Sequence, residues 1–217
     1  MTRIKICGIT RAQDAVACAE AGADAIGLVF AKSPRQVTLR KAKWIAAEVP
    51  PFVSIVGVFA NANVPTIFNA VLEVGLSEVQ LHGEESLSLA TALGGLRVVK
   101  ALRVRNKTFI DDMQKFAKAG VSGVLLDAFS PTARGGSGRR FDWDLVAGAR
   151  EAGALDGAPP IILAGGLTPQ NVRSAVRRLR PWGVDVSTGV ETSPGVKSAE
   201  KISRFVAAVR SASDGAK

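Results

Sequence analysis

Four polar side chains stand where short apolar runs of the sequence end. Cys7 closes IKIC (residues 4–7), His82 closes EVQLH (78–82), Asp127 closes GVLLD (123–127) and Ser187 follows VDV (184–186). A thiolate can accept a proton and a carboxylic acid can donate one, so Cys7 and Asp127 are a possible base and acid. If the fold brings these ends together, they suit proton-transfer chemistry.

Each of these residues also has a purely structural interpretation. A lone cysteine is usually a small buried hydrophobe, as Cys18 within an amphipathic stretch is expected to be. Asp127 could cap a turn or pair with a basic neighbour. His82, the only histidine, could hold a neighbour in place rather than carry protons. Residue type alone leaves these alternatives open.

Two glycine-rich loops suggest where an anion would bind. In LAGGLTPQNV (163–172), two glycines precede Thr168, the expected N-cap of a helix, and Pro169, its expected first residue. VSTGVETSPG (186–195) is a similar segment. Free backbone N–H groups at a helix start attract phosphate. The loops could be mere tight turns, but together they predict a phosphate site.

A repeated unit must position these residues: a β-branched apolar run followed by an amphipathic stretch. The eight apolar runs are 4–7, 25–30, 54–59, 78–82, 97–102, 123–127, 160–166 and 184–189. The clearest helix-like stretches are 11–22, 40–49, 64–75, 107–120, 169–179 and 199–212. Strict alternation predicts parallel strands, and eight repeats in 217 residues predict a single α/β domain over 1–217, a (β/α)8 TIM barrel with eight parallel strands. An open doubly wound sheet is the alternative.

In such a barrel, alternate residues of a strand face the helices and the axis. Ile4 and Ile6 then face the helices, and Lys5 and Cys7 face the axis. The same rule places His82, Asp127 and Ser187 inside, at the C-terminal rim where barrel enzymes carry their chemistry. It also places Asp185 on the strand that closes against the first, so a buried Lys5–Asp185 ion pair is expected.

Bulk properties narrow the class of protein. The formal charge is +9 and the pI about 10.1, but the basic residues are spread along the chain without an aromatic-studded patch, which favours an anionic small molecule over nucleic acid. The sequence shows no signal peptide or membrane-spanning run, so a cytoplasmic protein is expected. Two cysteines without metal-ligand spacing predict no metal site.

A set of motifs runs in order along nearly the whole chain. They are KICGIT (5–10), GLVF with SPR (27–30 and 33–35), VGVF (56–59), VQLHG (79–83), LLD (125–127), GGSGRRFDW (135–143), LAGGL with NV (163–167 and 171–172) and VDVSTGVE (184–191). Together they resemble the phosphoribosylanthranilate isomerase family of tryptophan biosynthesis. The resemblance implies a single (β/α)8 barrel that catalyses an Amadori rearrangement without metal or organic cofactor and without an obligatory protein partner.

The resemblance also implies roles for particular positions. Cys7 falls on the general base and Asp127 on the general acid, while Arg35 falls on the residue that contacts the anthranilate group. The phosphate site falls on Gly165, Gly166, Ser187, Thr188 and Gly189, and His82 and Gly136 are placed among the substrate-binding residues. Gly136 lies in GGSG (135–138), which is expected to act as a lid. A double arginine, Arg139-Arg140, stands where the family often has one basic residue.

The rearrangement needs one acid and one base. Opening the ribose ring needs a proton on the ring oxygen, for which Asp127 must be partly protonated; an apolar strand end and the substrate phosphate would favour that form. The iminium then loses its C2′ proton to a base. The place of Cys7, at a strand end ahead of a helix in a basic chain, is expected to favour the thiolate.

Other functions compete with this one. A related aminoaldose isomerase of histidine biosynthesis would want aspartate in place of Cys7, and a pentose-phosphate epimerase would want metal-binding histidines and aspartates on several strands. A non-catalytic anion-binding or scaffold protein would need no acid and base at the rim. Cys7 and a single histidine favour the anthranilate isomerase.

Overall fold

Eight strands form a closed barrel in the computed structural model, which describes residues 1–128 and 143–213. Each strand pairs in parallel with the next, and the eighth pairs with the first. The strands are β1 (Arg3–Cys7), β2 (Ala25–Val29), β3 (Ser54–Phe59), β4 (Glu78–Leu81), β5 (Val98–Val104), β6 (Gly123–Ala128), β7 (Ile161–Leu163) and β8 (Gly183–Val186). The predicted (β/α)8 barrel is confirmed, and the open sheet is excluded.

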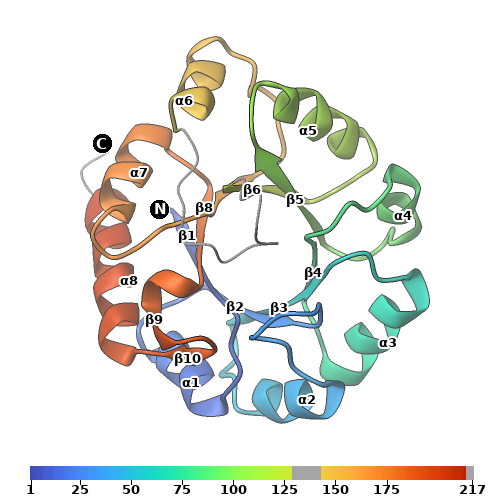
Figure 1. Ribbon diagram of the computed structural model, residues 1–217, viewed down its shortest axis with the longest axis vertical. Coiled ribbons are helices and arrows are strands. Elements are labelled where there is room, and N and C mark those ends of the chain that lie inside the picture. Colours follow the sequence, from blue (N-terminus) through green and yellow to red (C-terminus); the bar gives the residue numbers. More distant parts are fainter. Residues whose placement is uncertain (129–142, 214–217) are drawn as a thin grey trace.

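Helices surround the strands as an outer ring (Figure 1). They are α1 (Ala12–Glu20), α2 (Leu39–Ala47), α3 (Val64–Val74), α4 (Leu87–Ala92), α5 (Thr108–Lys118), α6 (Trp143–Glu151), α7 (Val172–Leu179) and α8 (Ala199–Ser213). Six of them match the helix-like stretches of the sequence, while α4 and α6 were not among those stretches. In the part of the chain that the structure describes, no helix is long and apolar enough to cross a membrane.

Local sequence explains where several helices begin and end. The α3 helix begins after Asn63, whose side chain accepts a hydrogen bond from the N–H of Thr66, and ends at Gly75 in the left-handed conformation. Thr38 caps α2 in the same way by accepting from the N–H of Lys41. These caps determine where α2 and α3 begin.

The core has an outer and an inner part, as alternation along the strands requires. Ile4 and Ile6 are buried in the large cluster between barrel and helices. A second cluster packs inside the barrel: Val99, Ala101, Leu125, Ile162 and Ala164. This inner layer closes the barrel and supports the polar residues at the rim.

The connection between β8 and α8 contains structure that the sequence did not predict. A 3-10 helix, η1 (Thr188–Val190), is followed by a small antiparallel hairpin of β9 (Glu191–Ser193) and β10 (Val196–Lys197). The hairpin lies beside α1 (Figure 1). This connection carries charged residues to the rim next to β1.

Candidate active site

Cys7 ends β1 and faces the barrel interior, as alternation predicts. It is 8% exposed and packs with Val29 and Val58 from the next two strands. Gly27 is its neighbour on β2, and a Cβ there would lie 2.9 Å from the Cys7 sulfur. The glycine therefore makes room for the thiol.

The predicted ion pair lies directly beneath this thiol. Lys5 and Asp185 are register partners on β1 and β8, and Lys5 Nζ donates to Asp185 Oδ1 at 2.8 Å. Both side chains are 9% exposed. Burial disfavours the charged lysine, but the carboxylate more than compensates and raises the pKa of Lys5. The prediction of a buried charge pair at the closing seam is confirmed.

Burial raises the pKa of the Cys7 thiol above its ordinary value. The ammonium groups of Lys5 and Lys197 oppose this effect, and the carboxylate of Asp185 reinforces it. The direction is opposite to the expected stabilisation of the thiolate by its position in a basic chain. A strand end inside a closed barrel is too poorly hydrated for that expectation to hold.

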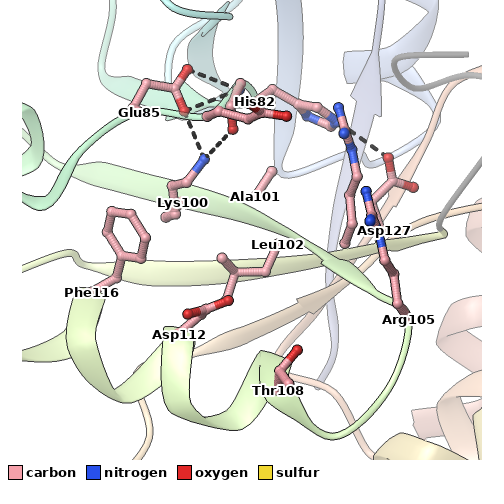
Figure 2. A pocket seen from close by; sticks show the side chains of 13 residues that line it. His82, Glu85, Lys100, Ala101, Leu102, Arg105, Thr108, Asp112, Phe116 and Asp127 are labelled. Carbon is pink, nitrogen blue, oxygen red and sulfur yellow. Dashed lines mark hydrogen bonds and ion pairs between the residues drawn. The ribbon is translucent and has the colours of Figure 1, made fainter.

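Asp127, His82 and Gln80 form a chain of contacts across β6 and β4. His82 Nε2 lies 3.2 Å from Asp127 Oδ2 (Figure 2). Gln80 Nε2 lies 2.7 Å from His82 Nδ1. An amide nitrogen can only donate, so Nδ1 accepts and Nε2 carries the proton that points to Asp127. The structural interpretation of His82, as a residue that holds its neighbour by hydrogen bonding, agrees with this geometry.

A pocket of about 440 Å³ opens on this side of the barrel and is lined by both His82 and Asp127. In its wall, Lys100 Nζ donates to Glu85 Oε2 at 2.7 Å and to the carbonyl of Gly83 at 2.8 Å (Figure 2). Glu85 also accepts from the N–H of Gly83. Lys100 and Glu85 therefore hold the chain that carries His82, a role that the sequence did not reveal.

The two predicted phosphate turns lie against each other. Gly165 and Gly166 are both in the left-handed conformation, with φ of 79° and 65°. A Cβ on Gly189 would collide with the carbonyl of Leu167, so only glycine lets the second turn approach the first. Ser187 and Thr188 continue from β8 into this contact.

The α7 helix, which follows the Gly165-Gly166 turn, begins later than predicted. Thr168 is not its N-cap: α7 begins at Val172, after a turn over the preceding residues. Asn171 explains the difference, because its Oδ1 accepts from the N–H of Thr168 and its Nδ2 donates to the carbonyl of Gly166. Its side chain closes the glycine turn and delays the regular helix.

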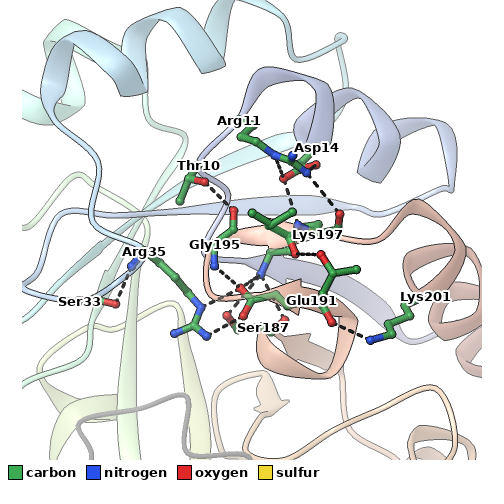
Figure 3. A network of polar contacts seen from close by, with 12 residues as sticks. Thr10, Arg11, Asp14, Ser33, Arg35, Ser187, Glu191, Gly195, Lys197 and Lys201 are labelled. Atoms are coloured by element: carbon green, nitrogen blue, oxygen red, sulfur yellow. Dashed lines mark hydrogen bonds and ion pairs between the residues drawn. The ribbon is translucent and has the colours of Figure 1, made fainter.

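Arg35, expected to contact the anthranilate group, lies on the Cys7 side of the rim. Its Nε and Nη2 donate to the two carboxylate oxygens of Glu191 at 2.8 and 2.6 Å (Figure 3). Lys197 Nζ donates to the same carboxylate at 2.7 Å. Glu191 is the last residue of the VDVSTGVE motif, so the sequence contained a signal that could have identified it. Nothing in the sequence singled out Lys197.

Some expectations fall on residues that the structure does not describe. Gly136, the GGSG segment and Arg139-Arg140 all lie between 129 and 142, outside the described residues. Over residues 1–128 and 143–213, no cluster of three or more His, Cys, Asp or Glu side chains could hold a metal ion.

Comparison with known proteins agrees with the geometry. A family model described as N-(5'phosphoribosyl)anthranilate (PRA) isomerase matches residues 4–208. N-(5'-phosphoribosyl)anthranilate isomerases from Azotobacter vinelandii and Pelobacter propionicus are 49% and 45% identical over 97% and 95% of this chain, and 98% and 94% of their own lengths. The Thermotoga maritima phosphoribosyl anthranilate isomerase structure has a TM-score of 0.87 at 39% identity, covering 97% of this chain and all of that one.

A further solved isomerase is in complex with reduced 1-(o-carboxyphenylamino)-1-deoxyribulose 5-phosphate. It has a TM-score of 0.84 at 38% identity and covers 97% of this chain and all of that one. The ligand named there joins an aromatic carboxylate to a sugar phosphate.

Proposed function

Since the chain belongs to the N-(5'-phosphoribosyl)anthranilate isomerase family, we propose that it performs the family's reaction by general acid/base catalysis. The reaction is the Amadori rearrangement of N-(5-phosphoribosyl)anthranilate to 1-(2-carboxyphenylamino)-1-deoxyribulose 5-phosphate, in tryptophan biosynthesis. It is an aldose–ketose isomerisation within one molecule.

Asp127 is the general acid of the first step. The C1′–O bond of the ribose ring breaks as the amine nitrogen forms a C=N bond, and the ring oxygen takes the proton that Asp127 gives. Asp127 is suited to this because it stands at the end of β6, lines the pocket and is oriented by His82. A positioned acid of this kind contributes about 10²–10⁴-fold to the rate.

Cys7 is the general base of the second step. It removes the C2′ proton of the iminium, and the electrons of that C–H bond form the enolamine, which then tautomerises to the ketone. The thiol must be ionised to act, and the two ammonium groups near it, Lys5 and Lys197, favour that form against the cost of burial. The base and the acid are buried to a similar degree, at 8% and 7% exposure.

The ends of the substrate are bound by different elements. The phosphate lies at the two turns of Gly165-Gly166 and Ser187–Gly189. Gly136, outside the described residues, is proposed as a substrate-binding residue from the sequence alone. The aromatic carboxylate is bound by Arg35, whose guanidinium has five N–H groups, of which Glu191 uses two. His82 holds the acid.

One observation carries the proposal: Cys7, Asp127 and both glycine turns lie at the same end of one closed barrel. The substrate is a small sugar phosphate; no metal, organic cofactor, nucleic acid or membrane takes part. We propose that residues 1–217 act as one catalytic unit in the cytoplasm.

The purified protein is expected to convert N-(5-phosphoribosyl)anthranilate to the ketose, equally well with and without a chelator. Its gene is expected to restore growth of a tryptophan-requiring strain that lacks this isomerase. Failure of both experiments would contradict the proposed function, and loss of activity on chelation would contradict its metal independence.

A further inference from the structure

A buried ion pair lies across the small hairpin beside the active site. Glu191 on β9 and Lys197 on β10 are register partners, so their side chains share a face. Lys197 Nζ lies 2.7 Å from Glu191 Oε1, and the side chains are 0% and 5% exposed. Charges this well buried need partners, and each residue has more than one.

The second partner of Glu191 comes from the other side of the rim. Arg35, in the connection after β2, forms two parallel hydrogen bonds with the Glu191 carboxylate, and its side chain is only 12% exposed. Gly8 makes room for this arginine, since a Cβ there would collide with Arg35 Cδ. The plane of the guanidinium is thus set by Glu191.

The second partner of Lys197 lies in the phosphate turn. Its Nζ also donates to the carbonyl of Ser187 at 3.2 Å and lies 3.4 Å from the Ser187 hydroxyl (Figure 3). One carboxylate therefore connects Arg35 to Ser187 through Lys197. Without it, the cations of Arg35 and Lys197 would face each other with no charge between them.

The hairpin that carries Glu191 is fastened to the barrel. Thr10 Oγ1 donates to the carbonyl of Gly195 at 2.6 Å, and the Lys197 N–H donates to Asp14 Oδ2 at 3.2 Å (Figure 3). Lys201 Nζ on α8 donates to the carbonyl of Glu191 at 2.7 Å. The position of Glu191 is thus determined by contacts with the loop after β1, with α1 and with α8.

We propose that Glu191 is a positioning residue that sets the spacing between the two ends of the substrate site. It holds Arg35 for the aromatic carboxylate and, through Lys197, holds the Ser187–Gly189 turn for the phosphate. This inference rests on the proposed function, because it assumes that the ligand carries both groups. Glu191 itself bonds to protein groups and need not touch the substrate.

The test uses calorimetry to measure the affinity of two ligands for the wild type and three variants. Inorganic phosphate reports on the turn alone, and reduced 1-(o-carboxyphenylamino)-1-deoxyribulose 5-phosphate reports on both ends. Glu191→Gln is expected to weaken the reduced product about tenfold or more and phosphate measurably. Arg35→Ala is expected to weaken only the reduced product. Glu73→Gln, which breaks the exposed Lys43–Glu73 pair, is the matched control and is expected to change neither.

In kinetics, Glu191→Gln is expected to raise KM more than it lowers kcat, which loss of folded protein alone would not do. If Glu191→Gln does not fold, Glu191→Gln/Lys197→Met removes the buried pair as a unit and is expected to fold and to bind both ligands weakly.

The inference would be overturned if Glu191→Gln, or the double variant where Glu191→Gln does not fold, bound both ligands with affinities within twofold of wild type. Weaker binding of the reduced product with unchanged phosphate binding would overturn the connection to the turn. Absence of isomerase activity in the wild type would contradict the proposed function, but the phosphate measurement would still test Glu191.

Discussion

The two sides of the barrel mouth are built differently. On the Cys7 side, three cations and two carboxylates are paired beneath and beside the thiol, and their side chains are no more than 12% exposed. On the Asp127 side, the carboxyl group is just as buried, with a side chain 10% exposed, but it lines a pocket and is held by His82, whose side chain is 19% exposed. The proposed base lies among buried ion pairs, and the proposed acid is held by a histidine beside a pocket.

This difference fits the chemistry proposed for each side. A base that acts on a C–H bond must meet a reactive iminium, which exclusion of water protects. An acid that protonates a ring oxygen must be held in the right orientation, and the contact with His82 provides that. The comparison predicts that changes to the charged residues beside Cys7 mainly disturb stability and ligand binding, and that changes at His82 mainly disturb the rate.

The largest effect is expected at the two residues proposed to transfer protons. Cys7→Ser and Asp127→Asn should each lower kcat by about 10²–10⁴-fold, with a much smaller change in KM, because both groups act in the transition state. Steady-state kinetics is the measurement. Cys18→Ser, at the other cysteine, buried within α1, is the control and should keep its kcat. An activity within tenfold of wild type would remove the changed residue from the mechanism.

The next effect concerns the charges beneath Cys7. Lys5→Met or Asp185→Leu alone should lower the free energy of unfolding by about 3–5 kcal/mol, because each leaves a buried charge without its partner. The double variant should lose much less than the sum. Denaturant unfolding of all four proteins completes the cycle, and additive losses would mean that the contact at 2.8 Å carries no coupling.

These two sides were not equally predictable from the sequence. Alternation along β1 and β8 placed Lys5, Cys7 and Asp185 on the axis, and the structure pairs the two charges as expected. Such inference works because strand parity is local and barrel closure makes the first and last strands neighbours. The pKa of Cys7 was not predictable, since burial depends on every element around the thiol.

The Glu191 network shows where sequence reasoning stops. Arg35 and Glu191 are 156 positions apart and meet only because the β9–β10 hairpin turns back over the rim. The late start of α7 has a similar cause, because the side chain of Asn171 bonds back to the glycine turn. Contacts of this kind depend on loop conformation, which no periodicity encodes.

A smaller, pH-dependent effect is expected at Glu85, which lines the same pocket as Asp127. Burial raises the pKa of Glu85, but the charge and hydrogen bonds of Lys100 and nearby N–H groups outweigh it and hold the pKa below its ordinary value. A lowered carboxyl pKa stabilises the fold above the unfolded pKa, and this contribution is lost as pH falls through the folded value. Glu85→Gln should therefore cost about 1.5–3 kcal/mol at pH 7 and progressively less below about pH 4.

Denaturant unfolding across pH measures this dependence. Glu48→Gln, at an exposed glutamate that follows α2, is the control and should show little difference from wild type at any pH. A gap between wild type and Glu85→Gln that is as large at pH 3 as at pH 7 would mean that the carboxylate charge does not stabilise this side.

The smallest effect distinguishes orientation from proton transfer at His82. His82→Leu removes the donor that faces Asp127 and should lower kcat about tenfold with little change in KM, the size of one lost hydrogen bond. His82→Gln should recover much of that loss, because the glutamine amide nitrogen can stand near the place of Nε2. Gln80→Leu should cost less than His82→Leu, since Gln80 acts only through the imidazole. If His82→Gln were as slow as His82→Leu, the hydrogen bond to Asp127 would not be the cause. If His82→Leu or His82→Gln were as slow as Asp127→Asn, His82 would itself carry the proton. The Asp127 side of the barrel mouth would then hold two proton-transfer groups instead of one.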